Sequence, residues 1–349
     1  MILVLTDRQK SILQIIIRDY TRTGMPVGSK ALASEFPTHV SSATVRNDMA
    51  ALESKGLITK THFSSGRVPS IEGYRYYVDN LVEPDPLDDS AEDLIKSSFN
   101  SEFNRIDEII QESAKVLSDL TSYMALTFNP ESGDNVTLGG FRLVKLDDRQ
   151  VMAIIVTNTG HVVNKIFRLA NVSSEQLETI VNIINTELVG KPLKQVLDKL
   201  KFDIPMLMTK YIQTPEGFLK IFGEMLNEAG RDKVHVDGEL NLLRFVERQD
   251  VDRLKPLYNL LGTEDTVQKI INTKSNDVQV RIGGELRNDL LKDYSIITGT
   301  YDLNEYGHGV IAVIGPTRMP YSKVIGIVGA LREELTKKLL GYYDDDQDS

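Results

Sequence analysis

The run from Val40 to Gly66 constrains the fold more than any other stretch of this 349-residue chain. Its first half has helical spacing, and its second half alternates as a short strand before a Ser-Gly turn. Apolar side chains gather on one side of the helical wheel, at Val45, Met49 and Leu52. The opposite side carries small and hydrogen-bonding residues, namely Ala43, Thr44, Arg46, Asn47, Ala50, Ala51 and Ser54. Because alanines allow close approach, and Arg and Asn suit guanine and adenine edges, this pattern predicts a DNA recognition helix.

Two helical segments precede this one. Thr6-Asp7 can cap a helix that runs to about Thr23 and ends at Gly24. Ser29 is expected to cap a second helix over Lys30–Glu35, and Ser41 or Ser42 a third that ends at Gly56. Three helices joined by short turns, with the atypical face on the third, describe a helix-turn-helix.

A hairpin is expected directly after the third helix. Leu57–Thr61 alternates as a strand, Ser64-Ser65-Gly66 is a turn signal, and Arg67–Pro69 returns as a second strand. This hairpin would be a wing, with Arg67 at its tip within reach of phosphate or the minor groove.

The remainder reads as a multidomain α+β protein. A Pro-rich acidic linker over 83–90 is followed by a helical stretch from 91 to about 123. Strands are expected at 141–146, 151–156 and 162–167. Helices are expected over 173–232, and two short helices follow near Leu257 and Ile270. Further strands at 278–282, 296–300 and 310–314 precede a final helix over 321–340. This order indicates one α+β domain that is interrupted by an inserted helical module.

Charge and composition exclude several classes of protein. The net charge is −10, but residues 1–80 hold 10 Lys and Arg against 7 Asp and Glu, which is compatible with DNA binding confined to this head. There is no cysteine, and the five histidines have no metal-ligand spacing, so neither a metal nor another cofactor is expected. No apolar run is long enough to span a bilayer and no signal peptide is evident, so we expect a cytoplasmic protein.

Several motifs together resemble one bacterial family, HrcA, the heat-inducible transcription repressors of chaperone operons. The motifs begin with LTDRQ at Leu5 and continue through the head and into the body. They are Gly24–Lys30 (GMPVGSK), Ser42–Asn47 (SATVRN), Leu52–Ile58 (LESKGLI), Ser64–Ser70 (SSGRVPS), Gly73–Asp79 (GYRYYVD), Asn241–Leu243 (NLL) and Gly315–Met319 (GPTRM). The resemblance covers essentially the whole chain.

The resemblance implies a domain organisation and a set of partners. It implies a winged helix-turn-helix over 1–82, a discontinuous GAF-like domain over 91–170 and 235–341, and an inserted dimerisation domain over 171–234. It implies a homodimer that binds an inverted-repeat operator upstream of chaperone genes in the nucleoid. It also implies that a GroEL-type chaperonin keeps the repressor active until heat shock. The acidic residues 342–349 are expected to form a disordered tail.

Candidate DNA contacts follow from these positions. Ser29 and Lys30 begin the second helix and would fix a phosphate. Ser41, Ser42 and Thr44 lie in the first turn of the third helix, Arg46 and Asn47 would read base edges, and Ser65, Gly66 and Arg67 belong to the wing. Simpler roles are open: the serines can be helix caps, Asn47 a solvated position, and Arg46 an ion-pair partner of Asp48 or Glu53.

Three other functions are compatible with parts of the sequence. A GAF-like body could bind a metabolite, although Gly283-Gly284 is a lone pair and no phosphate-cradling loop is evident. An enzyme could be fused to the head, but His161 and His308 lack nearby catalytic partners in sequence. The body could also sense heat directly through its own marginal stability.

Overall fold

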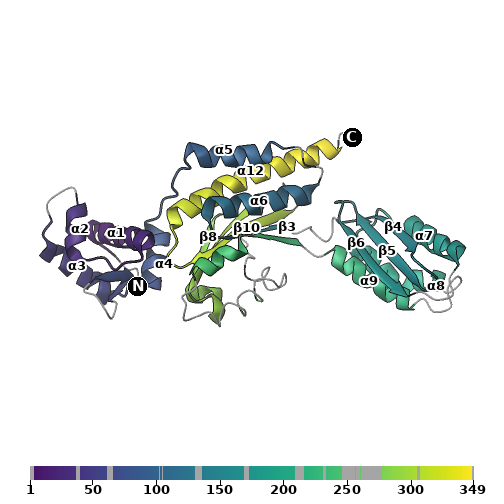
Figure 1. Ribbon diagram of the computed structural model, residues 1–349, viewed down its shortest axis with the longest axis horizontal. Helices are drawn as coiled ribbons and strands as arrows, with labels where there is room; N and C mark the ends of the chain where they lie inside the picture. The colour runs from purple at the N-terminus through teal and green to yellow at the C-terminus, as the bar shows by residue number, and fades with distance from the viewer. Residues whose placement is uncertain are drawn as a thin grey trace.

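The computed structural model describes most of the chain. The described residues exclude 1–3, 37–39, 61–65, 102, 104, 130–135, 169–172, 209–215, 231–232, 246–255, 257–259, 261–269, 271–276, 305–306 and 348–349. The helices expected near Leu257 and Ile270 therefore lie largely outside the described residues. Figure 1 shows an elongated molecule with a helical head at one end, a central body, and a third unit at the other end.

The head is a three-helix unit with a two-stranded wing. Its helices are α1 (Asp7–Thr23), α2 (Ser29–Glu35) and α3 (Ser42–Ser54). Thr6 and Gln9 form a capping box at the start of α1, and Gly24 ends it with φ of 67°, a left-handed conformation that glycine adopts without strain. The N-cap of α2 is Gly28, so the expectation that Ser29 caps this helix is wrong; Ser29 is its first residue.

The wing follows α3 in the chain and contacts both α3 and α1. Its strands β1 (Ile58–Lys60) and β2 (Arg67–Pro69) pair antiparallel, with Thr59 opposite Val68. Val27 adds a short bridge to Arg67, which ties the loop between α1 and α2 to the wing. The core beneath consists of fully buried aliphatic side chains from the three helices, including Ile12, Leu13, Ile16, Leu32, Val45 and Leu52.

Helix α4 (Ile71–Asn80) follows the wing and joins the head to the body. Gly73 lets α4 pack tightly, because a Cβ at this position would lie 2.0 Å from the Leu57 carbonyl oxygen. The rings of Tyr74 and Tyr321 lie 5.7 Å apart across the junction. Arg75 donates to the Val280 carbonyl over 2.7 Å and pairs with Glu285 at 3.2 Å.

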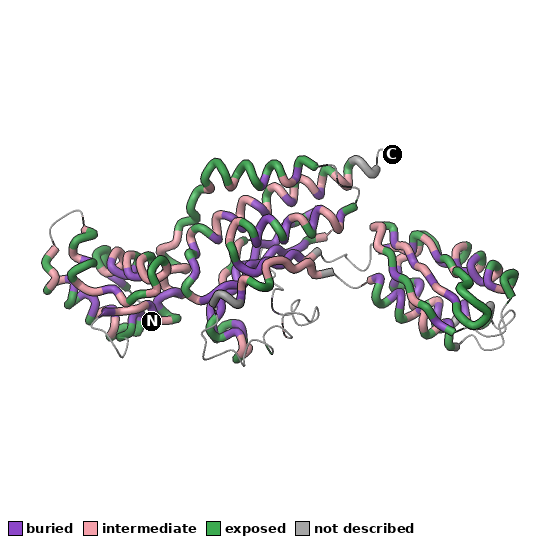
Figure 2. Tube along the Cα trace, in the orientation of Figure 1, coloured by how far each residue is buried: buried purple, intermediate pink, exposed green. Residues whose placement is uncertain are grey.

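The body is built on a five-stranded antiparallel sheet in the order β7-β3-β10-β9-β8. Its strands are β3 (Met124–Asn129), β7 (Lys233–Asp237), β8 (Gln279–Ile282), β9 (Tyr294–Asp302) and β10 (His308–Pro316). One face is covered by α6 (Ile106–Thr121) and α12 (Tyr321–Gln347), and α5 (Asp89–Phe99) packs on the outside of these two helices. The other is covered by three 3-10 turns, η1 (Glu239–Phe245), η3 (Gly283–Leu286) and η4 (Asp289–Leu291). Figure 2 shows the buried residues concentrated in the sheet, and α5 mostly exposed.

The third unit leaves and rejoins the body between neighbouring strands. β3 and β7 pair with each other, with Thr127 opposite His235, so the chain between them forms an excursion from the sheet. This excursion contains β4 (Leu138–Lys145), β5 (Gln150–Thr157), β6 (Val162–Arg168), α7 (Ser174–Leu188), α8 (Leu193–Met208) and α9 (Glu216–Ala229). The strands form their own sheet, and one of its faces shares a hydrophobic core with the helices.

The expected start of the inserted domain at 171 is therefore wrong. Val151, Ala153 and Ile155 of β5 pack against α7 and α9, and Phe141 of β4 lies 4.8 Å from Phe222 of α9, ring centroid to centroid. The meander at 138–168 thus belongs with the inserted helices rather than with the body. The other domain limits remain predictions.

Two further expectations need correction. The helical stretch from 91 to 123 is two helices, α5 and α6, separated by a break after Asn100. The tail is helical as far as Gln347, because Tyr342 and Tyr343 pack against the core of the body and extend α12. Among the described residues, no helix is long and apolar enough to cross a membrane.

Candidate nucleic-acid interface

Helix α3 separates its two faces as the wheel predicts. Val45, Met49 and Leu52 are buried in the head. Ala43, Arg46, Asn47 and Ala50 are exposed on the other side. The helix therefore offers a guanidinium and an amide between small side chains, which leaves room for a close surface such as the floor of a DNA groove.

The carboxylates that could neutralise Arg46 have other partners. Asp48 is nearly buried and accepts from Arg8 Nε over 2.5 Å. Glu53 pairs with Arg67, Nη2 to Oε2, at 2.8 Å. Arg46 has no ion pair among the described residues, which favours its assignment as a contact to an outside ligand over the simpler ion-pair role.

The N-terminal turn of α3 is held by its own serine. Ser41 accepts from the Thr44 backbone N–H over 3.1 Å, and the two hydroxyls lie 2.9 Å apart. Ser41 is therefore the N-cap of the helix, as the simpler interpretation expected. Ser42 and Thr44 are half-buried at the same end, beside the exposed Arg46.

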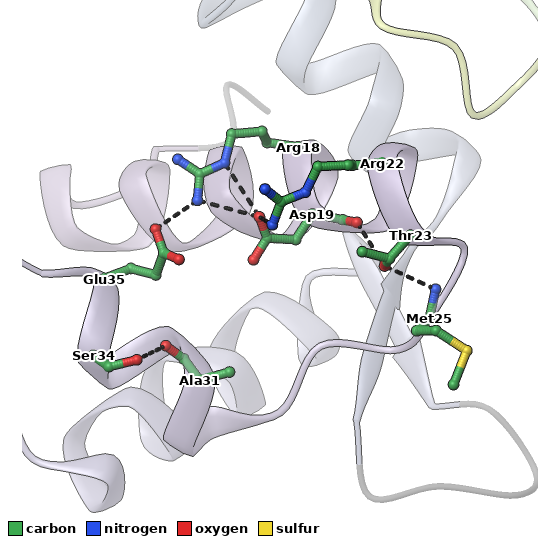
Figure 3. Close-up of polar contacts among 8 residues, drawn as sticks. All are labelled: Arg18, Asp19, Arg22, Thr23, Met25, Ala31, Ser34 and Glu35. Atoms are coloured by element: carbon green, nitrogen blue, oxygen red, sulfur yellow. Dashed lines mark hydrogen bonds and ion pairs between the residues drawn. The ribbon is translucent and has the colours of Figure 1, made fainter.

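A polar network fixes α1 against α2 (Figure 3). Arg18 bonds to Asp19 at 3.2 Å and to Glu35 at 2.6 Å, so its guanidinium joins the two helices. Ser34 donates to the Ala31 carbonyl within α2 over 2.7 Å. The hydrogen bond that Arg18 donates to Glu35 raises the pKa of Arg18. Lys30 is exposed near the start of α2.

Arg67 does not lie at the tip of the wing, in contrast to the expectation. It is the first residue of β2, opposite Lys60, and its side chain is only 12% exposed. Its Nε and Nη2 both donate to Glu53 Oε2, at 3.1 and 2.8 Å, so it ties the wing to the end of α3. Gly66 is buried beside it, and a Cβ there would lie 2.8 Å from the Pro26 Cβ. Ser65 lies outside the described residues.

The structure adds one residue that the sequence reading missed. Lys60 ends β1 with its side chain exposed, on the outward side of the wing. Alternation did not signal it, because Lys60 lies on the side of the strand on which Ile58 is buried; its exposure follows from its place at the end of β1. Among the described residues, no cluster of three His, Asp or Glu side chains could hold a metal ion.

A three-helix head with a wing behind an exposed Arg-Asn helix defines a winged helix-turn-helix DNA-binding protein. Two family profiles match this chain: the LexA DNA binding domain over residues 3–65 and the HrcA protein C terminal domain over residues 107–325. The chain belongs to the HrcA family, which confirms the resemblance of its motifs.

Known relatives match over nearly the whole length. The heat-inducible transcription repressor HrcA of Limosilactobacillus reuteri (strain DSM 20016) is 49% identical over 99% of this chain and 100% of its own. The protein of the same name from Enterococcus faecalis (strain ATCC 700802 / V583) is 48% identical over 97% of this chain and 99% of its own. A crystal structure described as a hypothetical protein shares the fold, with a TM-score of 0.61 and 22% identity over 97% of this chain and 98% of that one.

Proposed function

We propose that this protein is a heat-inducible transcriptional repressor that reads its operator with α3. The observation that carries the proposal is the exposed Arg46-Asn47 pair among small side chains, with the nearby carboxylates bound elsewhere. Arg46 would bind guanine O6 and N7, and Asn47 adenine N6 and N7. Lys30 and Lys60 would bind phosphates on either side and set the register of the helix on the duplex.

We propose that the repressor acts as a homodimer, joined through the inserted unit. The outer face of the β4-β5-β6 sheet has rows of apolar residues in register: Val144 beside Met152 beside Ile166, and Val156 beside Val162. Val144, Val162 and Ile166 are 40, 50 and 59% exposed. An exposed apolar face of this kind usually marks an interaction surface.

A second copy of the chain is the occupant that best fits this face. One head covers only a few base pairs, and a two-fold axis would double the contacts and match an inverted repeat. The third unit lies at the end of the molecule opposite the head, so pairing through it leaves both heads free (Figure 1).

Control by a GroEL-type chaperonin is proposed from family membership alone. Relatives that are 48 and 49% identical carry the name heat-inducible transcription repressor. Heat would unfold other proteins, these would occupy the chaperonin, and less active repressor would remain. The protein would act in the cytoplasm, at the nucleoid.

Footprinting of the purified full-length protein on a chaperone promoter tests the function. We expect protection of two half-sites related by a two-fold axis, about one helical turn or a multiple of it apart. Protection that spreads evenly along the DNA without preferred sites would contradict sequence-specific repression.

A further inference from the structure

A cavity of about 450 Å³ lies at the junction of the head and the body. Its walls come from α1, from Tyr77 at the end of α4, from Asp85 in the linker, and from the start of α12. The volume is in the range of small-molecule sites, which occur preferentially at domain interfaces. Because both sides of the junction line this cavity, an occupant would touch the head and the body at once.

The rim of the cavity is rich in cations. Arg18, Arg22 and Lys323 line it, against the single carboxylate of Asp85. Asp85 is held in place by the Ser322 hydroxyl, which donates to its Oδ1 over 2.8 Å. The Arg22 side chain is 73% exposed, and its Asp19 partner is 3.6 Å away. An anionic group would therefore find charge-assisted donors at the rim.

The inner wall of the cavity is largely aromatic. Tyr77, Tyr123 and Tyr321 line the cavity, and the Tyr321 hydroxyl lies 2.7 Å from the Ser295 hydroxyl and donates to the Thr317 carbonyl over 2.8 Å. The Tyr321 ring is thus fixed and buried, so the half-buried Tyr77 is the ring that offers a surface for stacking. Thr21 also lines the cavity. Burial raises the pKa of Tyr77 and Tyr123, so their hydroxyls stay neutral at physiological pH.

We propose that this cavity binds a small aromatic anion, with its ring on the tyrosine wall and its charge at Arg22 and Lys323. The ligand would link α1 of the head to α12 of the body and hold the two in one orientation. The backbone of the head at Gly24 already lies close to a side chain of the body, because a Cβ at Gly24 would lie 2.7 Å from Arg318 Nη1. Any effect of the ligand on DNA affinity rests on the proposed repressor function, whereas binding itself does not.

Calorimetric titration of the full-length protein with AMP and with salicylate tests the proposal, since each probe joins an aromatic ring to an anionic group. We expect at least one probe to bind with a Kd below the millimolar range. Arg22→Gln and Lys323→Gln should each weaken that binding about tenfold, the effect of losing one charge-assisted contact. Lys10→Gln on α1 and Lys337→Gln on α12 are matched controls that remove exposed charges outside the cavity lining, and they should bind as the wild type does.

Two results would overturn the proposal: neither probe binds at millimolar concentration, or binding is equally strong in Arg22→Gln and Lys323→Gln. Operator affinity measured with and without the bound probe then separates ligand binding from its effect on DNA binding. A change in affinity supports coupling of the cavity to the head. If the protein fails to bind DNA specifically while the probe still binds in the cavity, the repressor function is wrong and the ligand site stands.

Discussion

Asp48 and Glu53 lie on the same helix as Arg46, yet each carboxylate binds a different arginine. Arg8 reaches Asp48 from α1, and Arg67 reaches Glu53 from the wing. Both pairs therefore brace α3 against its neighbours and leave Arg46 exposed. The sequence spacing alone suggested local pairing of Arg46, because helical neighbours are visible in sequence whereas partners on other elements are not.

Replacing Arg67 by Ala should mainly destabilise the head. The substitution removes the two hydrogen bonds to Glu53 and leaves Glu53, which is 33% exposed, without this partner, at a cost of roughly 1–3 kcal/mol. Thermal unfolding should show a lower Tm. Glu53→Ala should have a similar effect, and the double variant should lose less than the sum of the two single losses. A normal Tm with a smaller salt dependence of DNA binding would instead make Arg67 a phosphate contact.

Lys30→Ala should weaken binding to every DNA sequence alike. A phosphate contact carries no sequence information, and its loss reduces the dependence of log K on log salt by about one unit. Fluorescence anisotropy over a salt series, on operator and on scrambled duplex, measures both quantities. A loss confined to the operator would show that Lys30 reads a base instead.

At the scale of elements, α12 presents two glycines to different surroundings. A Cβ at Gly326 would lie 2.3 Å from the Asp85 carbonyl oxygen, whereas a Cβ at Gly329 would meet nothing within 4 Å. Gly326→Ala should push the linker away from α12 and cost roughly 1–3 kcal/mol. Gly329→Ala should raise stability by about 0.5–1 kcal/mol, because alanine favours a helix interior. Denaturant unfolding of both variants checks this contrast, and equal effects would contradict the close packing of the linker.

Periodicity predicted most individual elements but not their partners. The limits of α1 and β2 match the structure at the residue level, and six strands of the body and inserted unit lie where alternation placed them. β3 and β7 were missed; each follows closely on a helix, α6 and α9 respectively. The assignment of the meander to the wrong unit has a related cause: alternation shows that a strand has one buried face, not which helices cover it.

The same limit applies to the candidate site. Exposure of Arg46 and Asn47 could be predicted from the wheel, since it depends only on helical spacing. The buried position of Arg67 could not, because it depends on how the wing folds back onto α3. Pairing across elements is a tertiary property, and no local pattern of residues encodes it directly.

At the scale of the whole molecule, the outer sheet face of the inserted unit should decide the oligomeric state. Ile166→Asp should produce a monomer, because it places a charge in the apolar rows, and its high exposure lets the fold accept the change. Met206→Asp, at a residue that is 74% exposed on α8 of the same unit, is the control and should remain dimeric. Sedimentation velocity distinguishes these outcomes. A monomeric wild type, or an Ile166→Asp dimer, would contradict this interface.

In the proposed complex, α3 reads base sequence through Arg46. The most direct test is the ratio of operator affinity to scrambled-duplex affinity, for the wild type, Arg46→Ala and the exposed-charge control Lys10→Ala. A bidentate base contact discriminates by about 1–3 kcal/mol, so Arg46→Ala should lower this ratio about tenfold to a hundredfold and leave scrambled-duplex binding nearly unchanged. The Lys10→Ala ratio should equal that of the wild type. An unchanged ratio in Arg46→Ala would contradict base reading by Arg46.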